Sequence, residues 1–201
     1  MDTPKLPASL LHILAQTEQL IKEHGCANTT LKMIMEQSAV SKGAIYHYVS
    51  SKDELFGLLL QSHISKIDAT FWSIIEDNCT RLEEPLSAIT EGLTFFLDEE
   101  DVTNSTFTYL LSKKDNPQVE KVLESFYAFS ESQAVSWIKA GQMGGVIDSN
   151  VDPALCASSF LTYSYGLRVM HIISPERTPK LKEQFYSDMY KTLARKNKPC
   201  Y

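Results

Sequence analysis

The sequence has little that would suit a secreted or membrane-spanning protein. Its four cysteines, at positions 26, 79, 156 and 200, form no Cys-x-x-Cys pair and no cluster with histidine. We interpret them as free thiols in a reducing compartment. The early apolar run at 10–15 is short and is interrupted by His12, unlike a secretory signal. No run approaches the ~18 apolar residues of a membrane span. We therefore expect a cytoplasmic protein that does not enter a membrane.

The sequence also lacks the motifs of the common enzyme classes. It contains no GxSxG, HExxH, GxGxxG or P-loop pattern. Its five histidines have no metal-ligand spacing with carboxylates or cysteines, and we interpret His63 and His171 as helix-surface or core residues. The absence of these motifs and of metal-ligand spacing predicts that the protein is not an enzyme and that it binds no metal and no cofactor.

Positive charge is scarce throughout the chain. The net charge is −6, and the first 55 residues carry five Lys, no Arg and six acidic residues. Any contact with nucleic acid must therefore be local rather than a broad basic surface. The composition, 43% apolar and 22% charged, is that of an ordinary globular protein. A length of 201 residues allows one or two domains with a sizeable core.

Apolar residues recur at helical spacing along almost the whole chain. The first stripe runs from Leu10 to Ile21 and ends at Gly25, a residue typical of the position after a helix. Ser51 begins a capping box that Glu54 completes. No segment alternates as a strand does, so we predict an all-α fold of about nine helices. After a second helix that follows 29–30, they are expected at 42–48, 52–78, 85–97, 106–113, 117–142, 153–173 and 179–196, with a loop at 98–105.

One stretch, SAVSKGAIYHYVSSKDELF at 38–56, crowds two tyrosines and a histidine onto a helix of about two turns. Such a short helix is marginal by itself in water. Helical spacing puts Ile45, Tyr48 and Val49 on one face, which we expect to pack inward. With the short helix before it and a tight turn at 39–41, the pattern matches a helix-turn-helix. The opposite face is small, aromatic and hydrogen-bonding, and consists of Gly43, Tyr46 and His47, with Lys42 at its edge.

This outward face suits a helix that lies in the DNA major groove. Gly43 lets the backbone approach closely, and Ala44 is small enough to touch a thymine methyl group. Tyr46 and His47 can donate to phosphate oxygens, and Lys42 can reach a phosphate or a guanine edge. Caps and cations at the starts of neighbouring helices add phosphate sites. The predicted DNA contacts are Thr29, Thr30, Ser41, Lys42, Gly43, Ala44, Tyr46, His47 and Lys52.

The segment TTLKMIMEQSAVSKGAIYHYVSSKDEL resembles the DNA-binding domain of the TetR family of transcriptional repressors. The resemblance rests on the threonines before the second helix, the VS turn, the KG opening, the IYHY core and the SKDEL start of the fourth helix. Two residues depart from the family pattern. Ala39 stands where the turn usually has Gly, which requires an ordinary φ or some strain, and Val49 replaces an aromatic residue.

The resemblance implies two domains: a three-helix helix-turn-helix domain at 1–55 and a helical effector-binding and dimerisation domain at 56–201. It implies a homodimer through the last two helices, whose small and large residues alternate, and a repressor that a small, largely apolar or aromatic effector releases from a palindromic DNA operator. Several alternatives stay open: a helical hairpin at 38–56 packed through its Tyr and His, a small helical enzyme, an interaction module without DNA, and a helix at 154–173 buried within one monomer. The candidate pocket residues, which core packing also explains, are Trp72, Phe96, Phe107, Tyr127, Trp137 and Tyr163.

Overall fold

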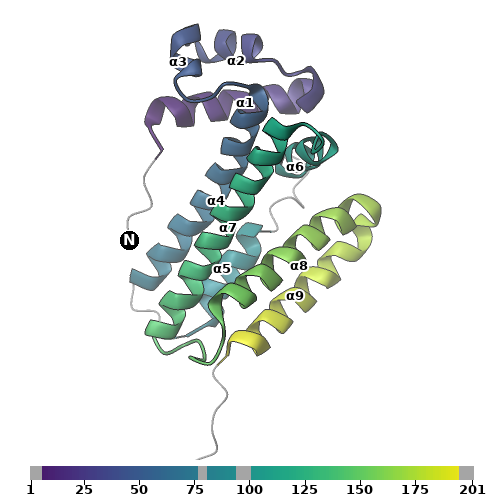
Figure 1. Cartoon of the computed structure of the whole chain (residues 1–201). Coiled ribbons are helices and arrows are strands. Elements are labelled where there is room, and N and C mark those ends of the chain that lie inside the picture. Colours follow the sequence, from purple (N-terminus) through teal and green to yellow (C-terminus); the bar gives the residue numbers. More distant parts are fainter. Residues whose placement is uncertain (1–5, 77–80, 94–100, 195–201) are drawn as a thin grey trace, which may run out of the picture. The chain divides into compact units, whose positions relative to one another are not determined.

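The computed structural model describes residues 6–76, 81–93 and 101–194 (Figure 1). Within these ranges the chain forms nine α-helices, one short 3-10 helix at Pro175–Arg177 and no strand. The predicted all-α fold is therefore confirmed. The α-helices are α1 (Ala8–Asn28), α2 (Leu31–Ser38), α3 (Lys42–Tyr46), α4 (Lys52–Glu76), α5 (Glu83–Leu93), α6 (Thr103–Ser112), α7 (Pro117–Met143), α8 (Pro153–Ile173) and α9 (Thr178–Leu193).

The chain divides into two compact units. Unit 1 comprises 1–65 and 98–128, and unit 2 comprises 66–97 and 129–201. Unit 1 therefore holds α1, α2, α3 and α6 with the N-terminal parts of α4 and α7, and unit 2 holds the rest. The boundary between 55 and 56 that the sequence suggests stays a prediction.

In unit 1, α1 buries one apolar stripe, as its periodicity predicts. Leu10, Ile13, Leu14, Leu20 and Ile21 are each at most 5% exposed. The regular helix stops at the predicted glycine, whose φ of 74° lies in the left-handed region that favours glycine. This sharp stop turns the chain toward α2, which contacts α1.

The turn between α2 and α3 contains the one non-glycine residue with positive φ in the described part of the chain. Ala39 adopts φ 52° and ψ 36°, and its neighbour Val40 donates its backbone N–H to Met35 O over 3.1 Å. This geometry closes the end of α2 as a left-handed cap does. The departure from glycine that the sequence shows is therefore accommodated by strain, because the left-handed region costs an alanine about 1–2 kcal/mol.

Helices α3 and α4 both begin with serine caps. Ser41 Oγ accepts from the backbone N–H of Ala44 at 3.2 Å, and Ser51 Oγ accepts from that of Glu54 at 3.1 Å. The Glu54 carboxylate reaches back to the backbone N–H of Ser50 at 2.6 Å, one residue earlier than the usual capping box. Helix α3 ends two residues before the predicted position, although bonds of the helical type continue as far as the Val49 N–H.

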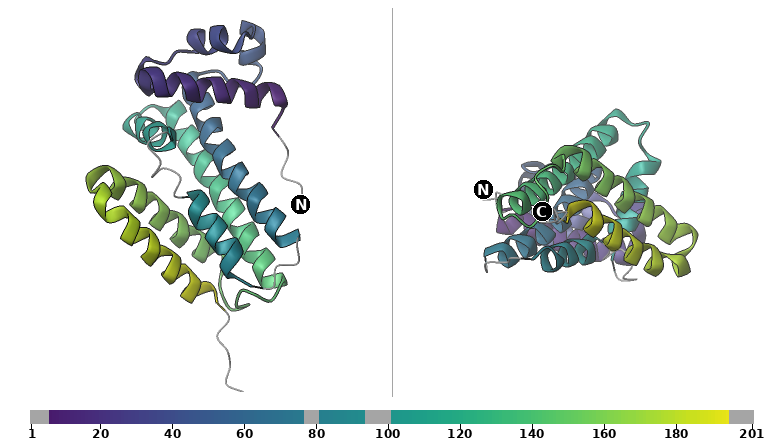
Figure 2. Two further views of the ribbon diagram at one scale, coloured as in Figure 1. Left: turned by 180° about the vertical axis from the view of Figure 1, so that it is seen from behind. Right: turned by 90° about the horizontal axis from the view of Figure 1, so that it is seen from below.

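In unit 2, α8 and α9 lie side by side as an antiparallel pair (Figure 2). Asp152 caps α8 by accepting from the backbone N–H groups of Ala154 and Leu155 at 2.9 and 3.0 Å. Tyr163 of α8 stacks on Phe185 of α9 with 4.6 Å between ring centroids. The bounds of α8 agree with the prediction, whereas α9 ends at Leu193 rather than at residue 196.

One predicted boundary near residue 100 is wrong. The expected loop at 98–105 already contains the start of α6, because Asp101 accepts from the Thr103 backbone N–H at 2.7 Å and so begins the helix early. Pro85 lies in the first turn of the next helix, as predicted, and this helix, α5, begins at Glu83. Residues 94–97 of the expected helix at 85–97 lie outside the described residues.

Replacing Ala39 with Gly should relieve the strain in the turn and stabilise the protein by about 1 kcal/mol, or about 2–4 °C in Tm. Thermal unfolding followed by circular dichroism measures the change. Gly25→Ala is the matched control: an added Cβ would meet no atom within 4 Å, so only the positive φ opposes it, and it should destabilise the protein. A lower Tm for Ala39→Gly would contradict the strained turn.

Candidate nucleic-acid interface and apolar cavity

Helix α3 presents the two faces that its sequence predicts. Ile45 is fully buried and Val49 is 3% exposed, whereas Tyr46 is 47% exposed. Tyr48 is held inward by a 2.7 Å hydrogen bond between its hydroxyl group and Ser9 Oγ of α1. The predicted inward and outward faces are therefore confirmed. The other exposed residues at this helix are Ser41, Lys42, Gly43, Ala44 and His47.

The outward face of α3 is open at its N-terminal end. A Cβ added to Gly43 would come no closer than 4.0 Å to any neighbouring atom, namely Ser41 Oγ. Lys42 Nζ lies 5.7 Å from the centre of the Tyr46 ring, so one cation and one aromatic ring stand together beside this opening. The arrangement combines hydrogen-bond donors with a gap where another backbone can approach.

The two threonines before α2 have different environments. Thr30 is exposed and caps α2, accepting from the Met33 backbone N–H at 3.2 Å. Thr29 is fully buried, and its hydroxyl group donates to Gly25 O at 2.9 Å. Thr29 is therefore not among the groups that this surface presents. Both threonines directly precede α2 and either could cap it, so the sequence alone does not show which of the two is exposed.

Lys52 is also engaged within the protein. Its ammonium group donates to the backbone carbonyls of Cys26, Ala27 and Thr29 at 2.9, 2.9 and 2.8 Å. An ammonium group has three N–H donors, and these three carbonyls use all of them. In this geometry Lys52 has no donor for a phosphate, in contrast to the contact that the sequence suggests.

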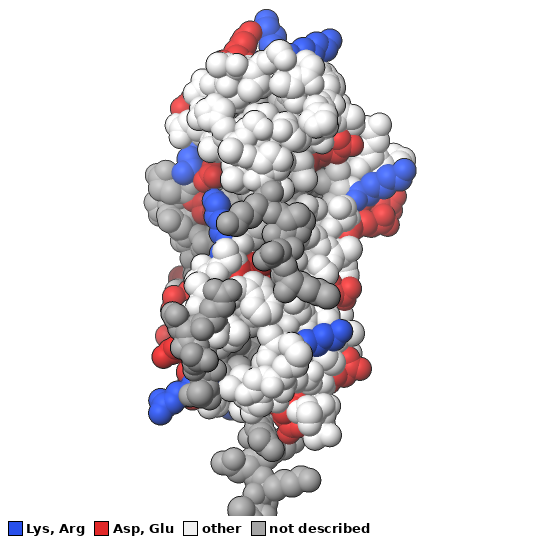
Figure 3. All heavy atoms as spheres, turned by 90° about the vertical axis from the view of Figure 1, so that its left-hand side faces the viewer, with Lys and Arg blue, Asp and Glu red and all other residues white. Residues whose placement is uncertain are grey.

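Charge is sparse over the rest of this surface. Lys32 of α2 pairs with Glu36 at 3.8 Å, and both side chains are largely exposed. On the face drawn in Figure 3, the α2–α3 end is mostly uncharged, with Lys and Asp or Glu side chains at its upper edge. The basic surface is thus local, as the near-neutral composition of the first 55 residues indicates.

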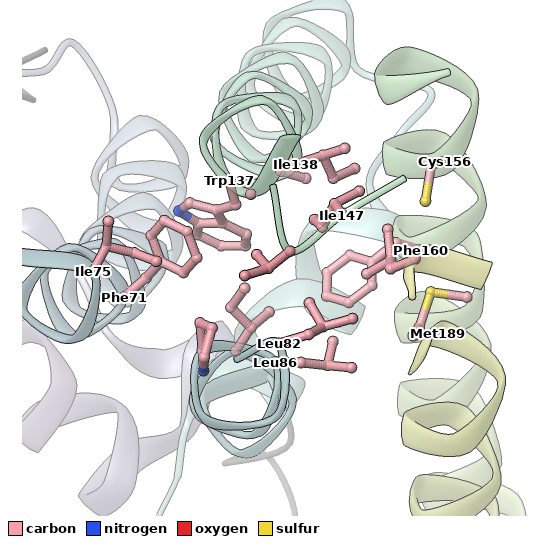
Figure 4. A pocket seen from close by; sticks show the side chains of 16 residues that line it. Phe71, Ile75, Leu82, Leu86, Trp137, Ile138, Ile147, Cys156, Phe160 and Met189 are labelled. Carbon is pink, nitrogen blue, oxygen red and sulfur yellow. The ribbon is translucent and has the colours of Figure 1, made fainter. Parts of the chain in front are cut away.

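Unit 2 contains a partly open apolar cavity of about 40 Å³. The rings of Phe71, Trp137 and Phe160 turn toward it from α4, α7 and α8 (Figure 4). Aliphatic side chains and the thioether of Met189 complete its walls. The one thiol among them, Cys156, is buried, and burial raises its pKa above the ordinary value, so the thiol is neutral at neutral pH.

Of the six predicted pocket residues, Trp137 is the one found among the described lining residues. Phe107 packs on Phe126 within unit 1, Tyr127 is 39% exposed and Tyr163 stacks on α9. Trp72 is half-buried beside Phe71 and does not line the cavity, and Phe96 lies outside the described residues. The residues that the sequence did not single out include Phe71, Leu82, Leu86, Ile147, Phe160 and Met189.

One buried carboxylate joins the two tryptophans of the chain. Asp68 is 2% exposed, and its Oδ1 accepts from the indole N–H of Trp72 at 2.9 Å and from that of Trp137 at 2.8 Å. The Trp137 indole therefore directs its polar atom to α4 and leaves its ring carbons for the cavity. Asp68 thereby fixes the orientation of an aromatic wall.

Within the described residues, no group of three or more His, Cys, Asp or Glu side chains could hold a metal ion. No helix in those same ranges is both long enough and apolar enough to cross a membrane.

A helix-turn-helix with an open outward face, in a chain whose other unit is a helical bundle around an apolar cavity, defines a class of DNA-binding regulators. Comparison with known proteins specifies the family. Residues 13–59 match the model of "Bacterial regulatory proteins, tetR family". The chain thus carries the DNA-binding domain of this TetR family of helix-turn-helix transcriptional regulators.

Two relatives agree with this assignment. The uncharacterized HTH-type transcriptional regulator YfiR of Bacillus subtilis is 26% identical over 161 residues, which cover 77% of this chain and 76% of that protein. An uncharacterized HTH-type regulator in the lacX 3′ region of Lactococcus lactis is 29% identical over 89 residues. That second match covers 43% of each protein, less than half of the relative's length.

Solved structures share the fold. A putative TetR-family regulator from Rhodococcus sp. aligns with a TM-score of 0.70 at 16% identity, covering 92% of this chain and 98% of that one. A second putative TetR-family regulator, from Syntrophomonas wolfei, aligns with a TM-score of 0.66 at 19% identity. The alignment covers 91% of this chain and 93% of that one. SmeT is a repressor from Stenotrophomonas maltophilia, and its complex with triclosan aligns with a TM-score of 0.60 at 16% identity. The alignment covers 95% of this chain and 94% of that one.

Replacing Asp68 with Leu should destabilise the protein by about 2–4 kcal/mol, because two indole N–H groups lose a buried acceptor. Asp68→Asn is the matched variant, since it keeps a carbonyl oxygen at this position, and it should cost clearly less. Urea unfolding followed by tryptophan fluorescence measures both. Equal stability of the two variants would show that the shared acceptor is unimportant.

Proposed function

We propose that the protein is a ligand-responsive, dimeric repressor that binds a palindromic DNA operator in the cytoplasm. The observation that carries this proposal is the exposed face of α3, where small and hydrogen-bonding residues surround an opening while the opposite face is buried. A catalytic role has no comparable observation in its favour.

In this proposal α3 lies in the major groove. Ala44 faces the base edges, where a methyl group can touch thymine, and Gly43 allows close approach of the backbone. Lys42, Tyr46 and His47 donate to phosphate oxygens or base edges. The capping hydroxyl groups of Thr30 and Ser41 are exposed and add phosphate contacts at the starts of α2 and α3.

The dimer forms through α8, with α9 beside it. Leu155, Val169, Ile172 and Ile173 of α8 are 69%, 44%, 57% and 70% exposed. A set of exposed apolar side chains on one helix is typical of a surface that another protein covers. The exposed residues between them are small, among them Gly166, which lets a second helix approach. A second copy of this chain pairs two α3 helices at the spacing of successive major grooves, about 34–36 Å.

The effector occupies the cavity of unit 2. Neutral, apolar walls favour an uncharged, apolar or aromatic compound. The SmeT complex with triclosan supports such a site in this fold. Helix α4 supplies Phe71 and Ile75 to the cavity near its C-terminal end, while Lys52 begins the same helix beside the helix-turn-helix. A ligand larger than the present space must displace a wall, and its differential affinity for the two conformations shifts the population away from DNA binding.

Selection from a randomised duplex library, followed by a gel-shift assay, tests the proposed DNA binding and yields the operator. Ala44→Gln should then weaken binding to that operator by about 1–3 kcal/mol and change the preferred base at one position of each half-site. Gln is a good helix former, so the fold should survive, which a circular dichroism melt confirms. An unchanged preference would show that Ala44 does not face the bases.

Replacing Gly166 with Leu should weaken dimerisation at least tenfold. An added Cβ meets no atom within 4 Å inside the chain, so the monomer should fold normally while the larger side chain keeps the second copy away. Sedimentation equilibrium measures the association. Glu124→Leu, on the exposed side of α7, controls for added surface hydrophobicity and should leave association unchanged. An equally stable Gly166→Leu dimer would place the interface elsewhere.

A further inference from the structure

Lys52 has surroundings that a DNA-contacting lysine does not need. Its three N–H donors are directed at three backbone carbonyls, all at hydrogen-bond distance and all from residues 26–29. Its ammonium group also lies 5.3 Å from the centre of the Tyr109 ring and 5.8 Å from that of Phe56. The charge is therefore surrounded by acceptors and ring faces of unit 1.

The end of α1 requires such a cation. The regular helix breaks at Gly25, and no basic residue lies between this break and Asn28, where α1 ends. The carbonyls that follow the break belong to the negative end of the helix dipole and have no helical partner further along the chain. Lys52 approaches from the first turn of α4 and supplies both the charge and the missing donors.

The same turn of α4 is held from a second side. Asp53, the next residue, pairs at 2.5 Å with Lys113, which directly follows α6, and Lys113 also donates to the hydroxyl group of Tyr109 in α6 at 3.1 Å. The end of α1, the start of α4 and helix α6 therefore meet at Lys52 and Asp53. A rotation of Lys52 toward solvent would break three hydrogen bonds and leave three carbonyls without their donor.

We propose that Lys52 is a positioning residue for DNA recognition and not a phosphate contact. Its ammonium group holds the segment 26–29, which leads directly into the capped start of α2, against α4. Lys52 thereby sets the orientation in which the helix-turn-helix presents α3. This inference rests on the proposed DNA binding and assigns a role to one residue within it.

The two roles differ in their dependence on salt. A lysine that neutralises a phosphate contributes about 0.9 to the slope of log K against log salt concentration, and its loss weakens operator and non-operator DNA alike. A positioning lysine contributes nothing to this slope. Its loss acts on the operator, because close docking to base edges depends on orientation, whereas non-specific binding depends on charge alone.

The first experiment compares Lys52→Met, Lys52→Arg and Lys42→Ala with the wild-type dimer on the selected operator and on a scrambled duplex of equal length. We expect Lys52→Met to lose at least tenfold in operator affinity with an unchanged salt slope and unchanged affinity for the scrambled duplex. Lys52→Arg should also lose affinity, because a planar guanidinium group cannot direct three donors at three converging carbonyls. Lys42→Ala, the exposed control, should lower the slope by about one unit per site.

A lower salt slope for Lys52→Met, with equal losses on both duplexes, would overturn the proposal. Full operator affinity of Lys52→Arg would overturn it too. A phosphate contact tolerates arginine, whereas the cage that the carbonyls of Cys26, Ala27 and Thr29 form around the ammonium group does not. Circular dichroism at the assay temperature establishes that each variant is folded, and Lys52→Arg retains the charge and the stem if Lys52→Met does not fold.

A second experiment needs no DNA and separates this inference from the proposed function. Brief acetylation of the free wild-type protein, read by mass spectrometry, should modify the exposed Lys42 much faster than Lys52, because the amine of Lys52 is half-buried and hydrogen-bonded to three carbonyls. Acetylation of Lys52 as fast as that of Lys42 would refute the cage. If selection enriches no duplex, the proposed function fails and the positioning role fails with it, although a protected Lys52 would still establish the cage itself.

Discussion

The burial of Ile45, on the inner side of α3, is the constraint on which the DNA-binding part of this chain depends. A helix of five residues does not persist by itself, so α3 exists because its apolar side is packed. With Ile45 and Val49 buried and Tyr48 tied to α1 through Ser9, the rotation of the helix about its axis is fixed. The small and polar residues between them then point outward. The composition of the exposed face is therefore a consequence of packing on the other side.

Much of the fold could be predicted because its signals are local. The stripe of α1, the glycine that ends it, and the serine caps of α3 and α4 each depend on residues a few positions apart. The two faces of α3 follow from helical spacing in the same way. The start of α6 was misplaced because Asp101, which accepts from the backbone N–H of its first residue, lies in an acidic run that is typical of a loop.

The rest could not be predicted because it depends on which distant groups meet. The charge of Lys52 suggests a phosphate, and only the folded chain brings three carbonyls from residues more than twenty positions away to its ammonium group. The cavity illustrates the same limit. Its walls come from separate helices of unit 2, and an aromatic residue such as Tyr163, equally plausible in sequence, stacks on a neighbouring helix instead.

Ala39 shows how tolerant such a chain is of a local defect. Every alanine codon becomes a glycine codon by one change at its second base, so the relaxed form of this turn is a single mutation away. The turn nevertheless carries an alanine at φ 52°. Natural proteins commonly keep such costs when their total stability exceeds what function requires. A search pattern that demands glycine at this position would therefore pass over a chain whose turn has the same shape.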